Sequence, residues 1–220
     1  MKRCAAVSSM VIAVMFALVA GCVNDPKPEF GEMTDARDGQ TYQTVKLGRQ
    51  TWLAHDLNYE TENSWCYGDD PANCEVYGRL YDWEAAKTAC PDGWHLATDE
   101  DWSTLIKYLD RKADPNNWIE SEIAGGMMKA TGTKEEGTGL WNSPNKDATN
   151  ISGFSAVPGG ARFDDGSCLV MGMHAIYWSS TEYDANSVWF RILDYGIGGI
   201  YRDNSNVTRT QGLTVRCVMD

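Results

Sequence analysis

The sequence is poor in the residues and motifs of several common protein classes. It has 3 histidines among 220 residues, and the hydrolase pattern G-x-S-x-G and the metalloprotease pattern H-E-x-x-H are both missing. No two cysteines stand at the C-x-x-C spacing of zinc sites. The Lys and Arg residues form no cluster, and 31 Asp and Glu outnumber 19 Lys and Arg. These absences argue against those hydrolase classes, a cysteine zinc site and nucleic acid as a partner.

The N-terminal segment has the pattern of an export signal. A basic start is followed by an apolar run over residues 11–18 and by small residues before Cys22. The run is too short for a membrane-spanning helix, and the pattern resembles the lipobox of bacterial lipoproteins. In that motif the cysteine thiol receives a diacylglyceryl group and the chain is cut just before it. We therefore predict a signal peptide over residues 1–21 and lipidation at Cys22. The alternatives are an ordinary signal peptide cut near Ala20 and an uncleaved anchor.

The charge of the processed chain bears on how it would contact a membrane. Cleavage would remove Lys2 and Arg3 and change the formal net charge from −12 to −14. So acidic a chain has no electrostatic attraction to anionic lipid, and the lipid on Cys22 is the expected membrane contact. Val23 follows that cysteine. In enteric bacteria an aspartate there favours the inner membrane, so we expect the outer membrane, with the domain in the periplasm or at the cell surface.

The remaining chain is long enough for one domain with a sizeable core. Residues 22–36 contain Pro26 and Pro28 among polar residues, which predicts an extended tether. Residues 37–220 form the predicted domain, and they contain no internal repeat and no low-complexity segment.

Hydrophobic spacing predicts helices in the first half of the domain. One is expected over residues 81–90, where good helix formers end at a Pro-Asp-Gly sequence. A second begins after Thr98, which with Asp101 resembles a capping box. Its apolar face consists of Trp102, Leu105, Ile106 and Leu109. A third, weaker helix is predicted over residues 118–129, although Gly125-Gly126 interrupts it.

Strands are expected towards both ends of the domain. The β-prone runs are residues 42–47, 51–54, 153–157, 176–181, 188–193 and 213–218. The first two flank a glycine turn and predict a hairpin. Residues 59–73 and 131–150 are predicted loops, and long loops in compact domains are often functional. The fold class is therefore α+β, with two or three helices and antiparallel strands.

The cysteines agree with an exported protein. Cys4 lies in the signal and Cys22 would carry the lipid, which leaves Cys66, Cys74, Cys90, Cys168 and Cys217 in the domain. Five is an odd number, so at least one thiol is unpaired or pairs between chains. The exported compartment permits disulfides. The turn sequence Gly68-Asp69-Asp70-Pro71 favours a disulfide that closes the loop between the first two of them.

Six motifs, taken in order, carry a resemblance to one protein family. They are Trp65-Cys66-Tyr67, Cys74 with Tyr77-Gly78-Arg79-Leu80-Tyr81-Asp82-Trp83, Cys90-Pro91-Asp92-Gly93-Trp94-His95-Leu96, Gly153-Phe154-Ser155-Ala156-Val157-Pro158-Gly159-Gly160, Trp178-Ser179-Ser180-Thr181-Glu182 and Val215-Arg216-Cys217-Val218. Residues 38–219 resemble the Fibrobacter succinogenes major paralogous domain. The resemblance implies an exported, often lipid-anchored bacterial protein. It also implies a fold related to C-type-lectin-like domains and, more distantly, to the formylglycine-generating enzyme.

The resemblance also implies a disulfide pairing. In lectin-like domains a cysteine at the first helix pairs with one in the last strand, and these positions match Cys90 and Cys217. Cys66 and Cys74 then form the local bridge. Cys168 is left as a buried inert thiol or as the site of an intermolecular bridge. The redox cysteines of the formylglycine-generating relatives match no pair in this chain.

Metal binding and catalysis find little support in the sequence. Sugar-binding C-type lectins carry Glu-Pro-Asn or Gln-Pro-Asp in the long loop, but Ser143-Pro144-Asn145 lacks the acid or amide before proline. Asp164 and Asp165 offer only two candidate oxygen ligands for calcium. We interpret His95 as a structural histidine and Glu182 as a hydrogen-bonded carboxylate that fixes a hairpin. We therefore expect no metal, no cofactor and no catalytic residue.

The aromatic residues are the remaining sign of binding, because 9 Trp and 10 Tyr are present and aromatic faces stack on sugar rings. Most of the tryptophans lie in helix or strand motifs and are expected in the core. Trp118 is a loop candidate, and Tyr195 and Tyr201 flank a glycine-rich turn. The predicted ligand-binding residues are Trp141, Arg162, Asp164 and Asp165 on the long-loop side.

The sequence thus favours a non-enzymatic, lipid-anchored domain of the cell envelope or surface. Its expected partner is a polysaccharide or another envelope protein. The alternatives are a purely structural envelope lipoprotein and an enzyme of unknown reaction.

Overall fold

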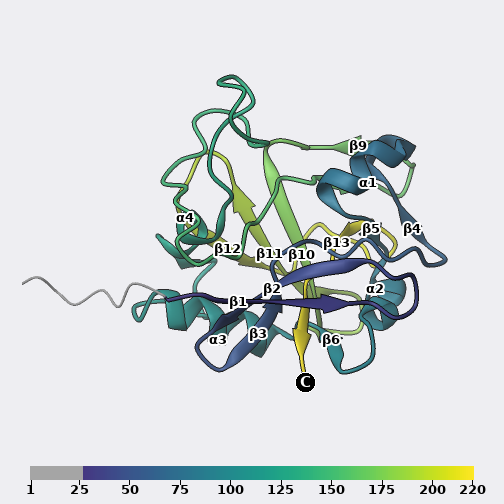
Figure 1. Cartoon of the computed structure of the whole chain (residues 1–220), viewed down its shortest axis with the longest axis horizontal. Helices are drawn as coiled ribbons and strands as arrows, with labels where there is room; N and C mark the ends of the chain where they lie inside the picture. The colour runs from purple at the N-terminus through teal and green to yellow at the C-terminus, as the bar shows by residue number, and fades with distance from the viewer. Residues whose placement is uncertain (1–26) are drawn as a thin grey trace, which may run out of the picture.

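The structure is a computed structural model, and it describes residues 27–220 (Figure 1). The predicted signal peptide, the lipidation site at Cys22 and the start of the tether lie outside the described residues. The described chain is a mixed α+β domain with two main sheets, a two-stranded sheet and short helices, which confirms the predicted class. Among residues 27–220, no helix has both the length and the apolar character that a membrane crossing needs.

The smaller main sheet has the strand order β1-β2-β3-β14-β6. Its strands are β1 (Glu29–Thr34), β2 (Thr41–Leu47), β3 (Gln50–Leu53), β6 (Trp94–Leu96) and β14 (Cys217–Met219). The β2–β3 pair is the predicted hairpin. The predicted tether is wrong from Glu29 onwards, because β1 pairs with β2 along its whole length. Proline content predicted extended chain there, and extended chain beside a free sheet edge becomes a strand.

The larger sheet has the order β4-β5-β13-β10-β11-β12-β7. Its strands are β4 (Ser64–Trp65), β5 (Leu80–Tyr81), β7 (Ile119–Ser121), β10 (His174–Glu182), β11 (Val188–Asp194), β12 (Ile200–Asp203) and β13 (Leu213–Thr214). Its strands pair antiparallel except β10 and β13. The remaining strands β8 (Ala161–Arg162) and β9 (Cys168–Leu169) pair with each other.

The helices are short, and side chains cap the first three of them at their N-termini. They are α1 (Pro71–Tyr77), α2 (Trp83–Ala89), α3 (Asp99–Leu109) and α4 (Ala124–Met128), with one 3-10 turn, η1 (Tyr67–Asp69). The capping box of Thr98 and Asp101 is present at the start of α3. Helix α1 replaces part of the predicted loop over residues 59–73, because Asp70 caps it and Pro71 occupies its first position.

The predicted third helix is largely wrong. Residues 119–121 form β7, the outer strand of the larger sheet, and only the five residues of α4 are helical. Gly125 and Gly126 lie inside this helix rather than interrupting it. A Cβ on Gly125 would meet the carbonyl oxygen of Gly199, and one on Gly126 that of Asp147. The two glycines therefore let α4 pack directly against backbone.

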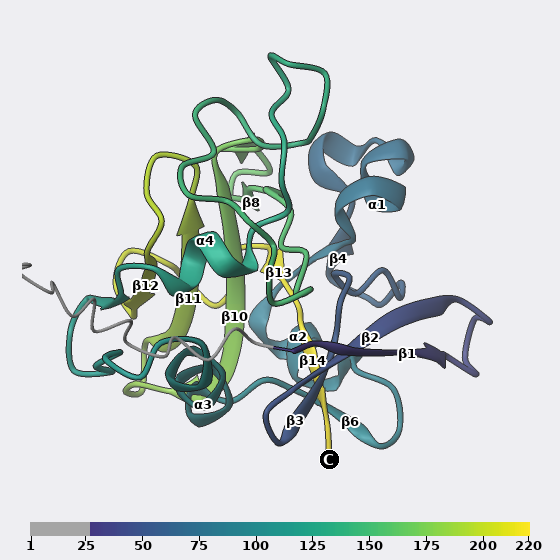
Figure 2. The ribbon, with the colours of Figure 1, turned by 60° about the vertical axis from the view of Figure 1, so that its left-hand side comes forward.

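The core lies between the two main sheets and the helices. Figures 1 and 2 show α3 beside the β10–β11 part of the larger sheet, with α4 on the same side. Four aromatic rings meet at its centre, with centroids 4.9–6.0 Å apart: Trp52, Trp102, Phe154 and Tyr177. This packing holds α3, which carries Trp102, against strand β10 of the larger sheet, which carries Tyr177.

Residues 129–160 contain no regular helix or strand and form the long loop at the top of Figures 1 and 2. The strand predicted over residues 153–157 is reduced to a single bridge between Ala156 and Lys129. Lys129 is fully buried, and its ammonium donates to the carbonyls of Lys146, Asp194 and Ile197 at 2.8–2.9 Å. This lysine ties the long loop to the turn between β11 and β12.

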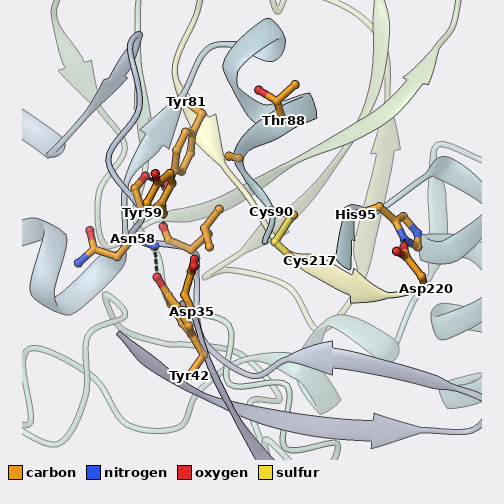
Figure 3. The surroundings of a disulfide bond; sticks show 12 residues. Asp35, Tyr42, Asn58, Tyr59, Tyr81, Thr88, Cys90, His95, Cys217 and Asp220 are labelled. Atoms are coloured by element: carbon orange, nitrogen blue, oxygen red, sulfur yellow. Dashed lines mark hydrogen bonds and ion pairs between the residues drawn. A yellow bond between two sulfur atoms is a disulfide. The ribbon is translucent and has the colours of Figure 1, made fainter. Parts of the chain in front are cut away.

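Both implied disulfides are present, so the pairing of the cysteines is confirmed. Cys66 is bonded to Cys74, and Cys90 to Cys217. Figure 3 shows the second bond, which joins the end of α2 to β14. Among the described residues, Cys168 forms no disulfide; it is half-buried, and its sulfur accepts a hydrogen bond from the amide of Gly68.

Candidate functional site

The predicted ligand-binding tryptophan of the long loop faces the core. Trp141 is fully buried, and its indole nitrogen donates to the carbonyl of Ala156 at 3.0 Å. The Lys129 ammonium lies 5.4 Å from its ring centroid. Trp141 is therefore unavailable for stacking on a ligand, and its prediction as a binding residue is wrong. A polar loop needs an apolar anchor of its own, and this ring supplies it.

The other three predicted residues lie around one turn, where neighbours occupy both carboxylates, while the buried Nε of Arg162 has no hydrogen-bond partner among the described residues. The Arg162 guanidinium lies 4.7 Å from the ring centroid of Trp65. Asp164 accepts hydrogen bonds from Thr208 and Thr210. Asp165 accepts two bonds from its own turn, from the hydroxyl and amide of Ser167, which lower the pKa of this carboxyl. In the described part of the chain, no three His, Cys, Asp or Glu side chains come together as a metal site requires.

His95 and Glu182 are both engaged by charged partners. His95 lies between two carboxylates: its Nδ1 is 2.7 Å from Asp220 (Figure 3), and its Nε2 is 3.1 Å from Asp101. Glu182 accepts a hydrogen bond from Arg209 at 3.0 Å. Burial alone would lower the pKa of His95, but hydrogen bonds to Asp220 and Asp101 outweigh it and raise that pKa. These contacts agree with the structural roles predicted for both side chains.

An exposed tryptophan lies at the outer edge of the larger sheet. Trp118 immediately precedes β7 and is 60% exposed. Its ring centroid lies 4.5 Å from that of Tyr201 in β12, with 37° between the two planes. Its indole nitrogen lies 3.4 Å from a carboxylate oxygen of Asp203. One ring face is thus supported by a neighbouring ring while much of the side chain stays in solvent.

A second tryptophan stands at the same end of β11 and β12. The Arg202 guanidinium carbon lies 3.3 Å from the ring centroid of Trp189. The ring of Tyr183, which is 55% exposed, meets Trp189 edge-on at 4.9 Å. An aromatic face therefore continues from the sheet edge onto the loop after β10.

The two tryptophans line one small hollow of about 210 Å³. We call it the aromatic hollow, and its lining residues are Asn116, Asn117, Trp118, Trp189, Arg202, Asp203 and Asn204. It combines ring faces with amide and carboxylate groups. A few polar groups that converge among aromatic side chains are typical of small-molecule and sugar sites.

Charged groups behind the hollow hold its walls in place. Arg202 donates to both oxygens of Asp99, at 3.0 and 2.7 Å, and to the carbonyl of Pro115 at 2.9 Å. Asp99 also accepts from Arg191, which is buried and paired with Glu120. Burial alone would raise the pKa of Asp99, but the bonds and charges of the two arginines outweigh it and lower that pKa. The positive charge of Arg202 is thus largely neutralised before any ligand arrives.

Residues 32–219 match the model of the Fibrobacter succinogenes major domain. The chain belongs to this family. No curated protein and no solved structure matches the chain.

Sequence patterns do not reveal most of the aromatic hollow, for identifiable reasons. Trp118 lies at the start of a predicted helix and is also a loop candidate, whereas Trp189 lies in the predicted strand 188–193, where tryptophans were expected in the core. The run Asp114-Pro115-Asn116-Asn117 before Trp118 is turn chemistry that, given more weight, marks an exposed loop. Nothing in the sequence shows that this loop lies beside the far ends of β11 and β12.

Proposed function

We propose that the domain binds a neutral polysaccharide at the aromatic hollow. The observation that carries the proposal is the exposed ring of Trp118, backed by Tyr201 and joined by Trp189 in one hollow with amide side chains. Pyranose rings present apolar C–H faces, which stack on such rings, and hydroxyl groups, which pair with amides and carboxylates. A rigid aromatic side chain such as Trp118 supplies this contact at low conformational cost.

The charges around the hollow favour a neutral ligand over an acidic one. The formal net charge of the chain is −12, and the hollow carries the carboxylate of Asp203. The guanidinium of Arg202 is already paired with Asp99. An acidic polysaccharide would therefore meet repulsion without a free cation to receive it.

The hollow also favours binding over hydrolysis. Most glycosidases need two carboxyl groups that flank the sugar bond, one as acid and one as nucleophile or base. Asp203 is the one carboxylate among the lining residues of the described chain. It already accepts hydrogen bonds from the amides of Asn204 and Ser205. We therefore propose a binding role without a reaction.

We further propose that the chain is a lipoprotein held in the outer membrane by a lipid on Cys22. The N-terminal sequence pattern supports this proposal. Strand β1 begins at Glu29, so the linker is residues 23–28, shorter than the tether first expected. At most ~3.5 Å per residue, it would hold the domain within about 25 Å of the lipid attachment.

We propose that the fold is related to C-type lectin-like domains. Three features support this: the disulfide from the end of α2 to β14, the long irregular loop, and the two helices α2 and α3 packed against the larger sheet. In this chain the proposed sugar site lies at the edge of the sheet, away from the long loop.

Retention on insoluble neutral polysaccharides tests the proposed function. The full chain, with its disulfides oxidised, is expected to bind at least one of xylan, mannan, cellulose and β-1,3-glucan, both with and without a calcium chelator. Trp118→Ala should weaken that binding about tenfold, which corresponds to ~1.4 kcal/mol. Phe30→Ala is the matched control, because Phe30 is a 56% exposed aromatic on β1, outside the hollow. Absence of retention on all four, or equal retention by Trp118→Ala, would overturn the proposal.

A further inference from the structure

A second hollow lies on the other side of the segment that carries Trp118. It has a volume of about 540 Å³ and a mostly apolar lining. We call it the α3 hollow; its lining includes Ser103, Thr104, Lys107, Tyr108, Ala113 and Pro115. Pro115 faces this hollow, and its neighbour Asn116 faces the aromatic hollow. Residues 113–118 therefore connect the two hollows, with Ala113 and Pro115 lining the α3 hollow and residues 116–118 lining the aromatic hollow.

The connecting segment of residues 113–118 is held by hydrogen bonds. The amide of Asp114 donates to the carbonyl of Glu120 at 2.8 Å, and Arg202 holds the carbonyl of Pro115. The carboxylate of Asp114 accepts from the amide and side chain of Asn116. The bonds to Glu120 and from Arg202 fix this loop to the sheet, and the bonds between Asp114 and Asn116 hold the loop's own turn.

The α3 hollow offers an aromatic contact of its own. Tyr108 is 40% exposed, and a Cβ on Gly48 would lie 3.0 Å from its ring. The ring is therefore packed against the backbone of the β2–β3 turn and held in one orientation. The ammonium of Lys107 donates to the carbonyl of Ala113 at 2.8 Å. The ammonium beside this hollow is therefore already hydrogen-bonded to the protein.

We propose that the two hollows form one site for an extended chain of neutral sugar units. The inference rests on the proposed function of the aromatic hollow. At about 210 Å³ that hollow is smaller than ordinary ligand pockets of ~300–1,000 Å³. The α3 hollow, at about 540 Å³, lies within that range by itself, so it has room for the sugar units that the aromatic hollow cannot hold. The occupant is the interior of a polymer that crosses Pro115, with units stacked near Trp118 and further units near Tyr108.

Chain-length dependence tests the extended site. The full chain is titrated calorimetrically with xylo-, manno-, cello- and laminari-oligosaccharides of two to eight units. Affinity should rise with length and then level off, once both hollows are filled. Tyr108→Ala should weaken the longest oligosaccharides about threefold to tenfold and leave the shortest unchanged, whereas Trp118→Ala should weaken all lengths.

A second variant guards against misfolding at Tyr108. Thr104 is exposed on α3 and lines the α3 hollow, so Thr104→Lys fills it with a side chain that a helix tolerates. Like Tyr108→Ala, this variant should remove the rise in affinity with oligosaccharide length. If Trp118→Ala weakens binding while both α3 variants bind every length like wild type, the extended site is wrong and the proposed function stands. If none of the oligosaccharides binds the wild type, both proposals fail together.

Discussion

At the scale of single residues, Lys129 shows how a buried charge can organise a loop. Its three carbonyl partners come from the long loop, from β11 and from the turn after it. A bound cation does the same for loops in other proteins, by collecting oxygen ligands from distant segments. Here a side chain supplies the positive charge, so the loop needs no ion to hold this arrangement.

Replacing this lysine should be costly. Lys129→Met keeps most of the side-chain volume but leaves three buried carbonyls without their donor, at about 1–3 kcal/mol for each unsatisfied group before relaxation. We expect the free energy of unfolding in urea to fall by roughly 3–5 kcal/mol. Lys146→Met is the matched control: its side chain is exposed, only its carbonyl is used, and its stability should stay within ~0.5 kcal/mol of wild type.

The difference in stability between wild type and Lys129→Met should also depend on pH. Burial lowers the pKa of Lys129 to about 8, although Asp194 and Asp147 partly offset it. Above that pH the folded state releases a proton that the unfolded state keeps, so wild type gains stability relative to Lys129→Met between pH 8 and about 9.5. Burial also raises the pKa of Tyr42 to about 12, which lowers the stability of both proteins at higher pH and therefore cancels in their difference. A constant difference across this window would contradict the assignment.

At the scale of elements, the start of α3 is held by its capping box. The Thr98 hydroxyl accepts from the amide of Asp101 at 3.0 Å, and the Asp101 carboxylate accepts from the amide of Thr98 at 2.9 Å. Thr98→Ala should lower the free energy of unfolding by about 1–2 kcal/mol, and Thr98→Ser should restore most of it. Thr104→Ala, at an exposed position within the same helix, should change little. The comparison uses thermal and urea unfolding of the three variants.

Local signals explain which elements could be predicted. The capping box and the apolar spacing of α3 lie within the helix itself, and the β2–β3 hairpin needs only its own glycine turn. Strand β1 and helix α4 depend on neighbours instead. β1 exists because β2 offers a free edge, and α4 exists because Gly125 and Gly126 fit against backbone from distant loops.

The proposed binding surface likewise depends partly on local sequence and partly on tertiary neighbours. The aromatic content indicated a binding surface, but it did not distinguish a tryptophan buried in the core from one exposed for ligand binding. Trp141 and Trp118 both follow polar, turn-rich sequence, yet one is fully buried and the other is 60% exposed. What separates them is tertiary: Trp141 meets Ala156 inside the long loop, whereas Trp118 meets Tyr201 at an uncovered sheet edge.

At the scale of the whole molecule, the two disulfides should differ in their effect on stability. Cys90 and Cys217 are 127 residues apart, whereas Cys66 and Cys74 are 8 apart. The chain-entropy relation gives about 5 kcal/mol for the long loop and about 2.5 kcal/mol for the short one. Replacing both cysteines of a pair by alanine should reproduce this order in urea unfolding under oxidising conditions.

The free cysteine supplies the control for that comparison. Cys168→Ser keeps an acceptor for the amide of Gly68 and breaks no bridge, so its stability should stay within ~0.5 kcal/mol of wild type. An equal loss from the two double variants would show that entropy of the unfolded chain is not what the bridges contribute here.

The place of β14 has a consequence for biosynthesis. This strand, which ends at Met219, lies inside its sheet, with β3 on one side and the edge strand β6 on the other. Residues 29–96 leave the ribosome long before it does, so the sheet they belong to stays split into two parts while the chain is being made. This sheet therefore closes only after residue 219 has emerged, and until then β3 and β6 lack the strand that joins them.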